Sequence, residues 1–128
     1  MARYPCPCCG YLTSSSPGGY DICPVCGWED DLAQLRFANM PWGPNRYSLW
    51  DAQQNYLTTG CSDPELVEQG RIRAGSADGV PRDPQWRPLR PDDIEEGEPG
   101  VEYGMTYPSD PEQLYYWRAT YWRRKGPA

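Results

Sequence analysis

The sequence predicts a small α+β fold that is stabilised by a zinc ion bound to cysteines rather than by a large apolar core. The chain has 128 residues, enough for one modest domain. Fifteen prolines and thirteen glycines divide it into short elements, so ten tyrosines and six tryptophans must supply much of the buried surface. Such a chain buries too little apolar area to offset its conformational entropy. Its six cysteines are the expected source of further stability.

Two clusters of cysteines match each other position by position. CPCCG at 6–10 and CPVCG at 23–27 both read C-P-x-C-G, and Cys8 falls at the variable position. Two residues between the cysteines let one tight turn, here called a knuckle, direct both sulfurs at a single ion. The proline fixes φ, and the glycine permits a positive φ. The predicted metal ligands are Cys6, Cys9, Cys23 and Cys26.

The ion expected between the knuckles is one structural Zn²⁺ bound by four cysteines, because paired C-x₂-C motifs at this spacing are typical of zinc. MARYP carries no apolar stretch before the first cysteine, which predicts a cytoplasmic protein. In that compartment paired cysteines favour a metal, although export with disulfides 6–23 or 9–26 is an alternative. Iron in a rubredoxin-like redox site is the main rival, because both metals accept four sulfurs.

A site with four cysteine ligands leaves no open coordination position. Zinc bound in this way has no water to activate, and the chain contains no histidine that could act as a base near neutral pH. The sequence therefore predicts that the protein is not an enzyme and has no catalytic residues and no small-molecule substrate. The fold expected around the ion is a zinc-ribbon-like N-terminal hairpin that carries both knuckles.

The elements next to the knuckles are expected to be a hairpin and a loop. β-prone residues at 11–13 and 20–22 flank SSSPGG and predict two paired strands. Residues 32–47 are expected to form a loop held by Trp42, because prolines interrupt any helix there. Trp28 directly follows the second knuckle and is expected to cover the metal site.

Two short helices are predicted in the middle of the chain. Residues 48–59 have apolar side chains at helical spacing, with Ser48 as N-cap and Gly60 as a stop. A second helix is expected over 63–69, because SDPE at 62–65 resembles a capping box with proline in the first turn. Cys61 lies between the two helices and is expected to be a small buried residue.

The last third of the chain divides by composition. An irregular, proline-rich segment completes a predicted domain at 1–90, and an acidic connector follows at 91–108. The final segment, 109–128, is expected to contain an amphipathic helix over 111–125 that packs on the domain or on a partner. Tyrosine, tryptophan and arginine are the residues that dominate binding hot spots. The candidate partner-binding residues are Tyr115, Trp117, Arg118, Tyr121 and Trp122.

Charge and hydropathy restrict the classes of partner. The formal net charge is −6, and the acids are concentrated in segments such as DDIEEGE at 92–98. A general nucleic-acid binder is usually basic, so this balance argues against DNA or RNA. No apolar run approaches the length that spans a membrane. A protein partner is the expectation that remains.

The sequence resembles the bacterial cysteine-rich CPCC proteins. The matching stretches are YPCPCCGY at 4–11, YDICPVCGWEDD at 20–31, the region 43–57 and RDPQWRPL at 82–89, and together they span about residues 3–90. The resemblance implies a small zinc-ribbon-like domain with no known enzyme activity. It also implies a companion of other bacterial genes, sometimes in toxin–immunity neighbourhoods.

The function predicted from these observations is a non-catalytic zinc-binding protein-interaction module, an immunity-type or adaptor protein. A zinc ribbon that contacts nucleic acid is the first alternative, and a rubredoxin-like iron or thiol redox protein is the second. Cys8 carries part of the redox alternative, because a spare thiol beside a metal could respond to oxidants. The structural alternative for Cys8 is a residue that faces outward or packs on a neighbour.

Overall fold

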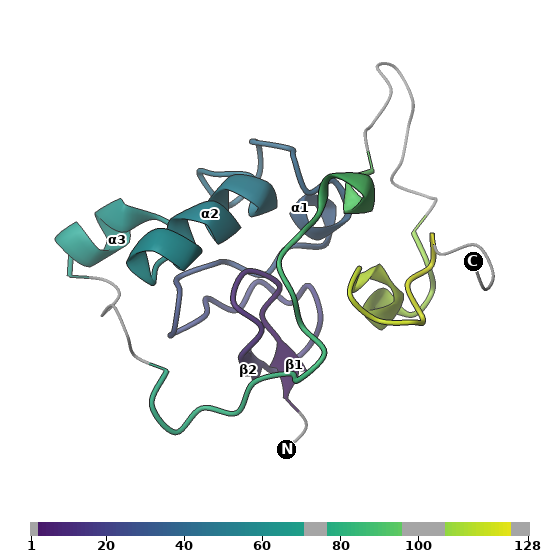
Figure 1. Cartoon of the computed structure of the whole chain (residues 1–128), viewed down its shortest axis with the longest axis horizontal. Helices are drawn as coiled ribbons and strands as arrows, with labels where there is room; N and C mark the ends of the chain where they lie inside the picture. Colours follow the sequence, from purple (N-terminus) through teal and green to yellow (C-terminus); the bar gives the residue numbers. More distant parts are fainter. Residues whose placement is uncertain (1–2, 71–76, 96–106, 124–128) are drawn as a thin grey trace.

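The computed structural model describes residues 3–70, 77–95 and 107–123. Short elements are arranged around the two knuckles, and the segment 77–95 passes beside the two strands before it reaches a 3₁₀ turn (Figure 1). The elements in chain order are β1 (Tyr4–Pro5), β2 (Leu12–Ser14), α1 (Leu32–Arg36), α2 (Leu49–Thr59), α3 (Pro64–Glu68) and the 3₁₀ helices η1 (Pro91–Asp93) and η2 (Pro111–Leu114). Among the described residues, no helix is long and apolar enough to cross a membrane.

The two-stranded antiparallel sheet surrounds the first knuckle. Tyr4 pairs with Ser14 and Pro5 with Leu12, with a shift in register between the two pairs. The predicted pairing of 11–13 with 20–22 is therefore wrong, since Ile22 pairs with Glu29 instead. The reason is that each knuckle is itself a tight turn, so it pairs the residues on its own two sides before a longer loop can close.

The helix predicted at 48–59 is confirmed with its caps. The hydroxyl of Ser48 accepts a hydrogen bond from the backbone N–H of Asp51 at 3.1 Å. Gly60 ends α2 in the left-handed conformation, with φ of 81°. The second predicted helix is present as α3, and its N-cap is Asp63, whose carboxylate accepts from the N–H of Glu65.

Helix α1 lies where a loop was expected. Asp31 caps it by accepting from the N–H of Gln34 at 2.9 Å. The side chain of Gln34 then donates to the carbonyls of Met40, Asn45 and Tyr47 and orders the loop that follows. Trp42 is 74% exposed, so the expectation that it holds this loop is wrong.

The amphipathic helix expected over 111–125 is also wrong. Over the described part of this range, 111–123, the only helical element is the 3₁₀ helix η2, and Tyr115 adopts an extended conformation with ψ of 102°. Tyr115, Tyr116 and Trp117 are all buried. A helix turns about 100° per residue and cannot bury three consecutive side chains in one core face, so burial of all three requires a non-helical backbone.

One hydrophobic cluster joins the knuckles, the helices and the C-terminal segment. It contains five of the cysteines together with Trp28, Leu49, Leu89 and Leu114–Trp117. A domain boundary was expected at residue 90, but residues on both sides of it contribute to this one cluster. Residues 96–106, most of the expected acidic connector, lie outside the described residues.

A buried arginine fastens the C-terminal segment to α1. Arg36 forms an ion pair with Glu95 at 3.0 Å, and its side chain is 4% exposed. Three rings surround the guanidinium, with centroids 4.7 Å away for Phe37 and Tyr107 and 4.8 Å away for Trp122. Cation–π contacts and a desolvated carboxylate compensate a charge that could not otherwise be buried.

Candidate metal centre

The two knuckles have the same backbone hydrogen bonds. In the first, the N–H of Cys6 donates to the carbonyl of Tyr11 at 2.8 Å, and the N–H of Gly10 donates to the carbonyl of Cys6 at 2.6 Å. In the second, the N–H of Cys23 donates to the carbonyl of Trp28 at 2.9 Å, and the N–H of Gly27 donates to the carbonyl of Cys23 at 2.8 Å. The φ angles of Gly10 and Gly27 are 81° and 86°. The repeated C-P-x-C-G motif therefore folds into the same turn twice.

The sulfurs of Cys6, Cys9, Cys23 and Cys26 all lie within 4.8 Å of one another, and all four residues are buried. The Sγ atoms are 3.6 Å apart for Cys6 and Cys26, and 3.7 Å apart for Cys9 and Cys23. A tetrahedral ion with bonds of about 2.3 Å to sulfur places neighbouring sulfurs ~3.8 Å apart. The donor set fits a tetrahedral thiophilic metal in number, chemistry and spacing.

The protonation of these thiols shows why a cation suits the site. Burial raises the pKa of Cys6, Cys9 and Cys26 well above the ordinary thiol range. Hydrogen bonds from Cys26, the other two thiols and Thr13 lower the pKa of Cys23. Burial therefore disfavours the thiolate form at three of the four positions, and a positive ion among the sulfurs would favour it at all four.

Several groups outside the four sulfurs complete the second knuckle. The hydroxyl of Thr13 donates to the sulfur of Cys23 at 3.3 Å. The thiol of Cys61 and the N–H of Ser62 both donate to the carbonyl of Cys26, at 3.3 and 2.8 Å. Trp28 is fully buried in the hydrophobic cluster that also contains the four cysteines. These contacts connect the second knuckle to the end of α2.

The two remaining cysteines take no place in the four-sulfur group. Cys8 is fully buried in the hydrophobic cluster, which agrees with packing on neighbours rather than facing outward. Cys61 is also fully buried, as predicted, and its thiol donates to the carbonyls of Cys26 and Asp63. No disulfide joins any of the six cysteines in the structure, and the alternative pairings 6–23 and 9–26 stay untested.

The first knuckle is held by the segment RDPQW at 82–86. The N–H of Asp83 donates to the carbonyl of Gly10 at 2.8 Å, and the guanidinium of Arg82 donates to the backbone carbonyl of Cys9 at 2.9 Å. The indole N–H of Trp86 donates to the carbonyl of Pro7 at 2.9 Å. The prolines of this segment predict only irregular structure. Its only signal was its place among the stretches that carry the family resemblance.

Gln53 of α2 connects the first knuckle to the C-terminal segment. Its amide nitrogen donates to the carbonyl of Pro7 at 2.9 Å and contacts the hydroxyl of Tyr116 at 2.8 Å. Its amide oxygen accepts from the N–H of Leu89 at 2.8 Å. A buried glutamine whose donors and acceptor all have partners fixes the relative position of three segments.

Substituting Gly10 tests how closely this shell packs on the first knuckle. A Cβ at Gly10 would lie 2.6 Å from Cγ of Trp86, at a φ of 81°. Gly79 has a similar φ of 77° but open space around the same position. We expect Gly79→Ala to cost ~1–2 kcal/mol of unfolding free energy, and Gly10→Ala to cost about 2 kcal/mol more. Equal losses in denaturant titrations would contradict the packing.

The five candidate partner-binding residues lie mostly in the core. Tyr115, Trp117 and Tyr121 are buried, and Trp122 is partly buried. The guanidinium of Arg118 donates a hydrogen bond to the carboxylate of Asp83 at 3.2 Å, and the indole N–H of Trp117 donates to the same carboxylate at 3.0 Å. The C-terminal segment was expected to pack either on the domain or on a partner, and these buried side chains pack on the domain.

Asp30 is a buried carboxylate whose ionisation should affect stability. It accepts a 2.7 Å hydrogen bond from the N–H of Gly18. Burial, together with the nearby charges of Asp21 and Asp31, raises its pKa to about 6. An unfolded chain loses this proton near pH ~4, so the contribution of Asp30 to stability is complete below about pH 4 and is lost as the pH rises through about 6.

Asp30→Asn should remove this dependence, because the neutral amide keeps an acceptor for Gly18. We expect the variant to exceed the wild type by up to about 3 kcal/mol in unfolding free energy near pH ~7.5, with the difference disappearing toward pH ~4. Urea titrations at several pH values measure both curves. Parallel curves, or a less stable variant at the higher pH, would show that the carboxylate is accommodated in its charged form.

Together, the fold and the sulfur geometry define a small protein with a four-cysteine centre that could hold a metal ion. The model of the cysteine-rich CPCC family matches residues 4–76. The chain therefore belongs to the cysteine-rich CPCC family. The match ends before RDPQWRPL at 82–89, although the sequence resemblance was expected to include that stretch. A search of curated proteins found no match.

Proposed function

We propose that this chain is a non-catalytic zinc-binding module, located in the cytoplasm, that acts by binding another protein. The observation that carries the metal assignment is the group of four buried sulfurs at tetrahedral spacing. When bound, zinc supplies four metal–sulfur bonds that join the knuckles in a zinc-ribbon-like arrangement and leave no position for a substrate. Thr13, Cys61 and the RDPQW segment hold the ligands in place.

Elemental analysis of protein purified without added metal tests the first half of the proposal. We expect one zinc per chain, and we expect a chelator to abolish the folded state, because the binding energy of a structural ion is folding energy. A red iron form from native cells would favour the rubredoxin-like alternative, since iron accepts the same four sulfurs. A chain that is folded without metal would contradict the proposal.

The second half of the proposal is an interaction role of the immunity or adaptor type. It is supported by the net charge of −6, which steers a basic protein partner toward the chain and disfavours nucleic acid. The test is reconstitution: a partner identified by crosslinking should form a stoichiometric complex with the purified chain. If the purified chain instead binds only DNA or RNA, with strong salt dependence, the nucleic-acid alternative is favoured.

A further inference from the structure

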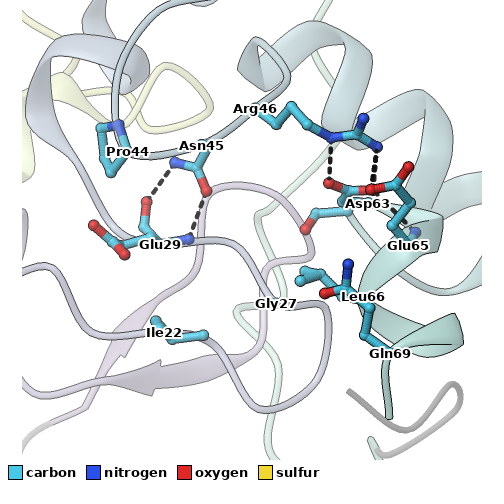
Figure 2. A pocket seen from close by; sticks show the side chains of 11 residues that line it. Ile22, Gly27, Glu29, Pro44, Asn45, Arg46, Asp63, Glu65, Leu66 and Gln69 are labelled. Atoms are coloured by element: carbon cyan, nitrogen blue, oxygen red, sulfur yellow. Dashed lines mark hydrogen bonds and ion pairs between the residues drawn. The ribbon is translucent and has the colours of Figure 1, made fainter. Parts of the chain in front are cut away.

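A groove of about 610 Å³ lies between the second knuckle, the loop at 44–46 and α3. Figure 2 shows Ile22, Gly27 and Glu29 on one side of it, and Leu66 of α3 and its C-cap Gln69 on the other. The groove is separate from the four sulfurs and from the C-terminal aromatic residues. A volume of this size accommodates a few side chains of a partner rather than a single water or ion.

The walls of the groove are fixed by contacts to the second knuckle. Asn45 accepts from the N–H of Glu29 at 2.8 Å and donates to its carbonyl at 2.7 Å, as the dashed lines in Figure 2 show. At the other wall, the thiol of Cys61 and the N–H of Ser62 donate hydrogen bonds to the carbonyl of Cys26. Helix α3 begins two residues after Ser62. The groove therefore exists in this form only when the second knuckle is folded.

The groove carries an excess of negative charge. Three carboxylates line it, those of Glu29, Asp63 and Glu65, against the single guanidinium of Arg46. Arg46 donates to both carboxylate oxygens of Asp63 at 2.9 Å and lies 3.5 Å from Glu65. Among the described residues, none forms an ion pair or hydrogen bond with the carboxylate of Glu29. One wall thus offers an uncompensated charge to an incoming cation.

An exposed aliphatic side chain stands beside this charge. Ile22 is 53% exposed and pairs across the knuckle with Glu29, so the two side chains lie on the same face. Leu66 of α3 is partly buried on the opposite side of the groove. An apolar anchor next to a carboxylate is the arrangement that recognises a peptide in which basic and aliphatic residues alternate.

We propose that this groove docks an extended, basic segment of a partner protein. A lysine or arginine of that segment meets Glu29 and the exposed carboxylate of Glu65, and an aliphatic neighbour packs against Ile22 and Leu66. The inference rests on the proposed interaction role and adds its location and the chemistry of the partner. It also makes partner binding depend on the metal centre, because the same knuckle forms the wall.

The test uses the full zinc-loaded chain and a short labelled peptide of alternating arginine and leucine. Control peptides carry glutamate for arginine, or serine for leucine. We expect the amide resonances of Ile22, Gly27 and Leu66 to shift on titration with the first peptide. We also expect its affinity, measured by fluorescence anisotropy, to fall with salt and to be about tenfold higher than that of either control peptide.

Two pairs of variants locate the binding. Glu29→Lys is matched by Glu68→Lys on the exposed face of α3, which changes the net charge equally but lies outside the groove. Ile22→Ser is matched by Leu57→Ser, because both side chains are 53% exposed. We expect about tenfold weaker binding for each groove variant and a change of about twofold or less for its control.

Equal effects within either pair, resonance shifts on another surface, or preference for the glutamate peptide would overturn the inference. So would an absence of binding by a chain that holds its zinc. Those outcomes leave the metal assignment intact, since each variant is first checked for one zinc per chain. Conversely, binding of the arginine peptide in the groove of a chain folded without metal would support the docking surface, but it would contradict both the structural role of zinc and the dependence of binding on the metal centre.

Discussion

Cys26→Ser is expected to abolish both metal binding and cooperative folding. The serine hydroxyl is a poor ligand for zinc, and the three remaining buried thiols cannot all ionise without a cation beside them. Structural zinc contributes roughly 10–16 kcal/mol of binding free energy, as much as the whole stability of a typical domain. Circular dichroism and zinc content per chain measure the two losses together.

The matched control is the same substitution at Cys8. Its sulfur lies outside the four-sulfur group, so Cys8→Ser should keep one zinc per chain and lose about 1–3 kcal/mol for a buried hydroxyl in an apolar site. Loss of zinc from the control, or a folded and metal-loaded Cys26→Ser chain, would show that the sulfurs bind in a different combination.

Trp117→Ala should be the most damaging substitution away from the cysteines. The indole is 7% exposed, stacks on Tyr115 with ring centroids 4.9 Å apart, and donates to Asp83 at 3.0 Å. Truncation leaves a cavity and removes the donor of a buried carboxylate. We expect a loss of ~3–5 kcal/mol in the free energy of unfolding, measured by denaturant titration of the zinc-loaded chain.

Trp42→Ala provides the comparison, since that indole is 74% exposed. Its expected effect is within about 0.5 kcal/mol. If both variants lost the same amount, or if Trp117→Ala were neutral, the C-terminal segment would not be part of the core. That result would favour a partner-binding role for Trp117.

The parts of the fold that could be predicted are the parts set by local chemistry. The two knuckles follow from a motif of five residues whose proline and glycine fix the turn, so the four cysteines that cluster in the structure could be chosen by aligning CPCCG with CPVCG. The helix at 49–59 was equally accessible, because Ser48 and Gly60 satisfy its ends with neighbouring residues. None of these features needs a contact from a distant segment.

The parts that could not be predicted depend on distant contacts. The spacing of Leu114, Trp117 and Tyr121 indicates a helix, yet three consecutive aromatic residues enter the core and the helix ends at Leu114. Helix α1 has five residues, too few to show a period. The pairing of 20–22 was misassigned because the second knuckle closes on its own flanks.

The groups that support the site show the same limit. Gln53 contacts Pro7 across 46 positions of the chain, and Trp86 contacts the same carbonyl across 79. No periodicity or spacing rule connects residues so far apart in the sequence. Only the quoted stretch RDPQWRPL marked the segment, and it gave no role to any residue in it.

The burial of Leu114–Trp117 beside the early cysteines has a consequence for biosynthesis. The ribosome releases Cys6 to Cys26 long before residues 114–117 are made, so the thiols that end up enclosed are exposed to solvent during much of translation. For any ion that the four sulfurs bind, this topology favours entry during synthesis, before the aromatic residues pack over the site.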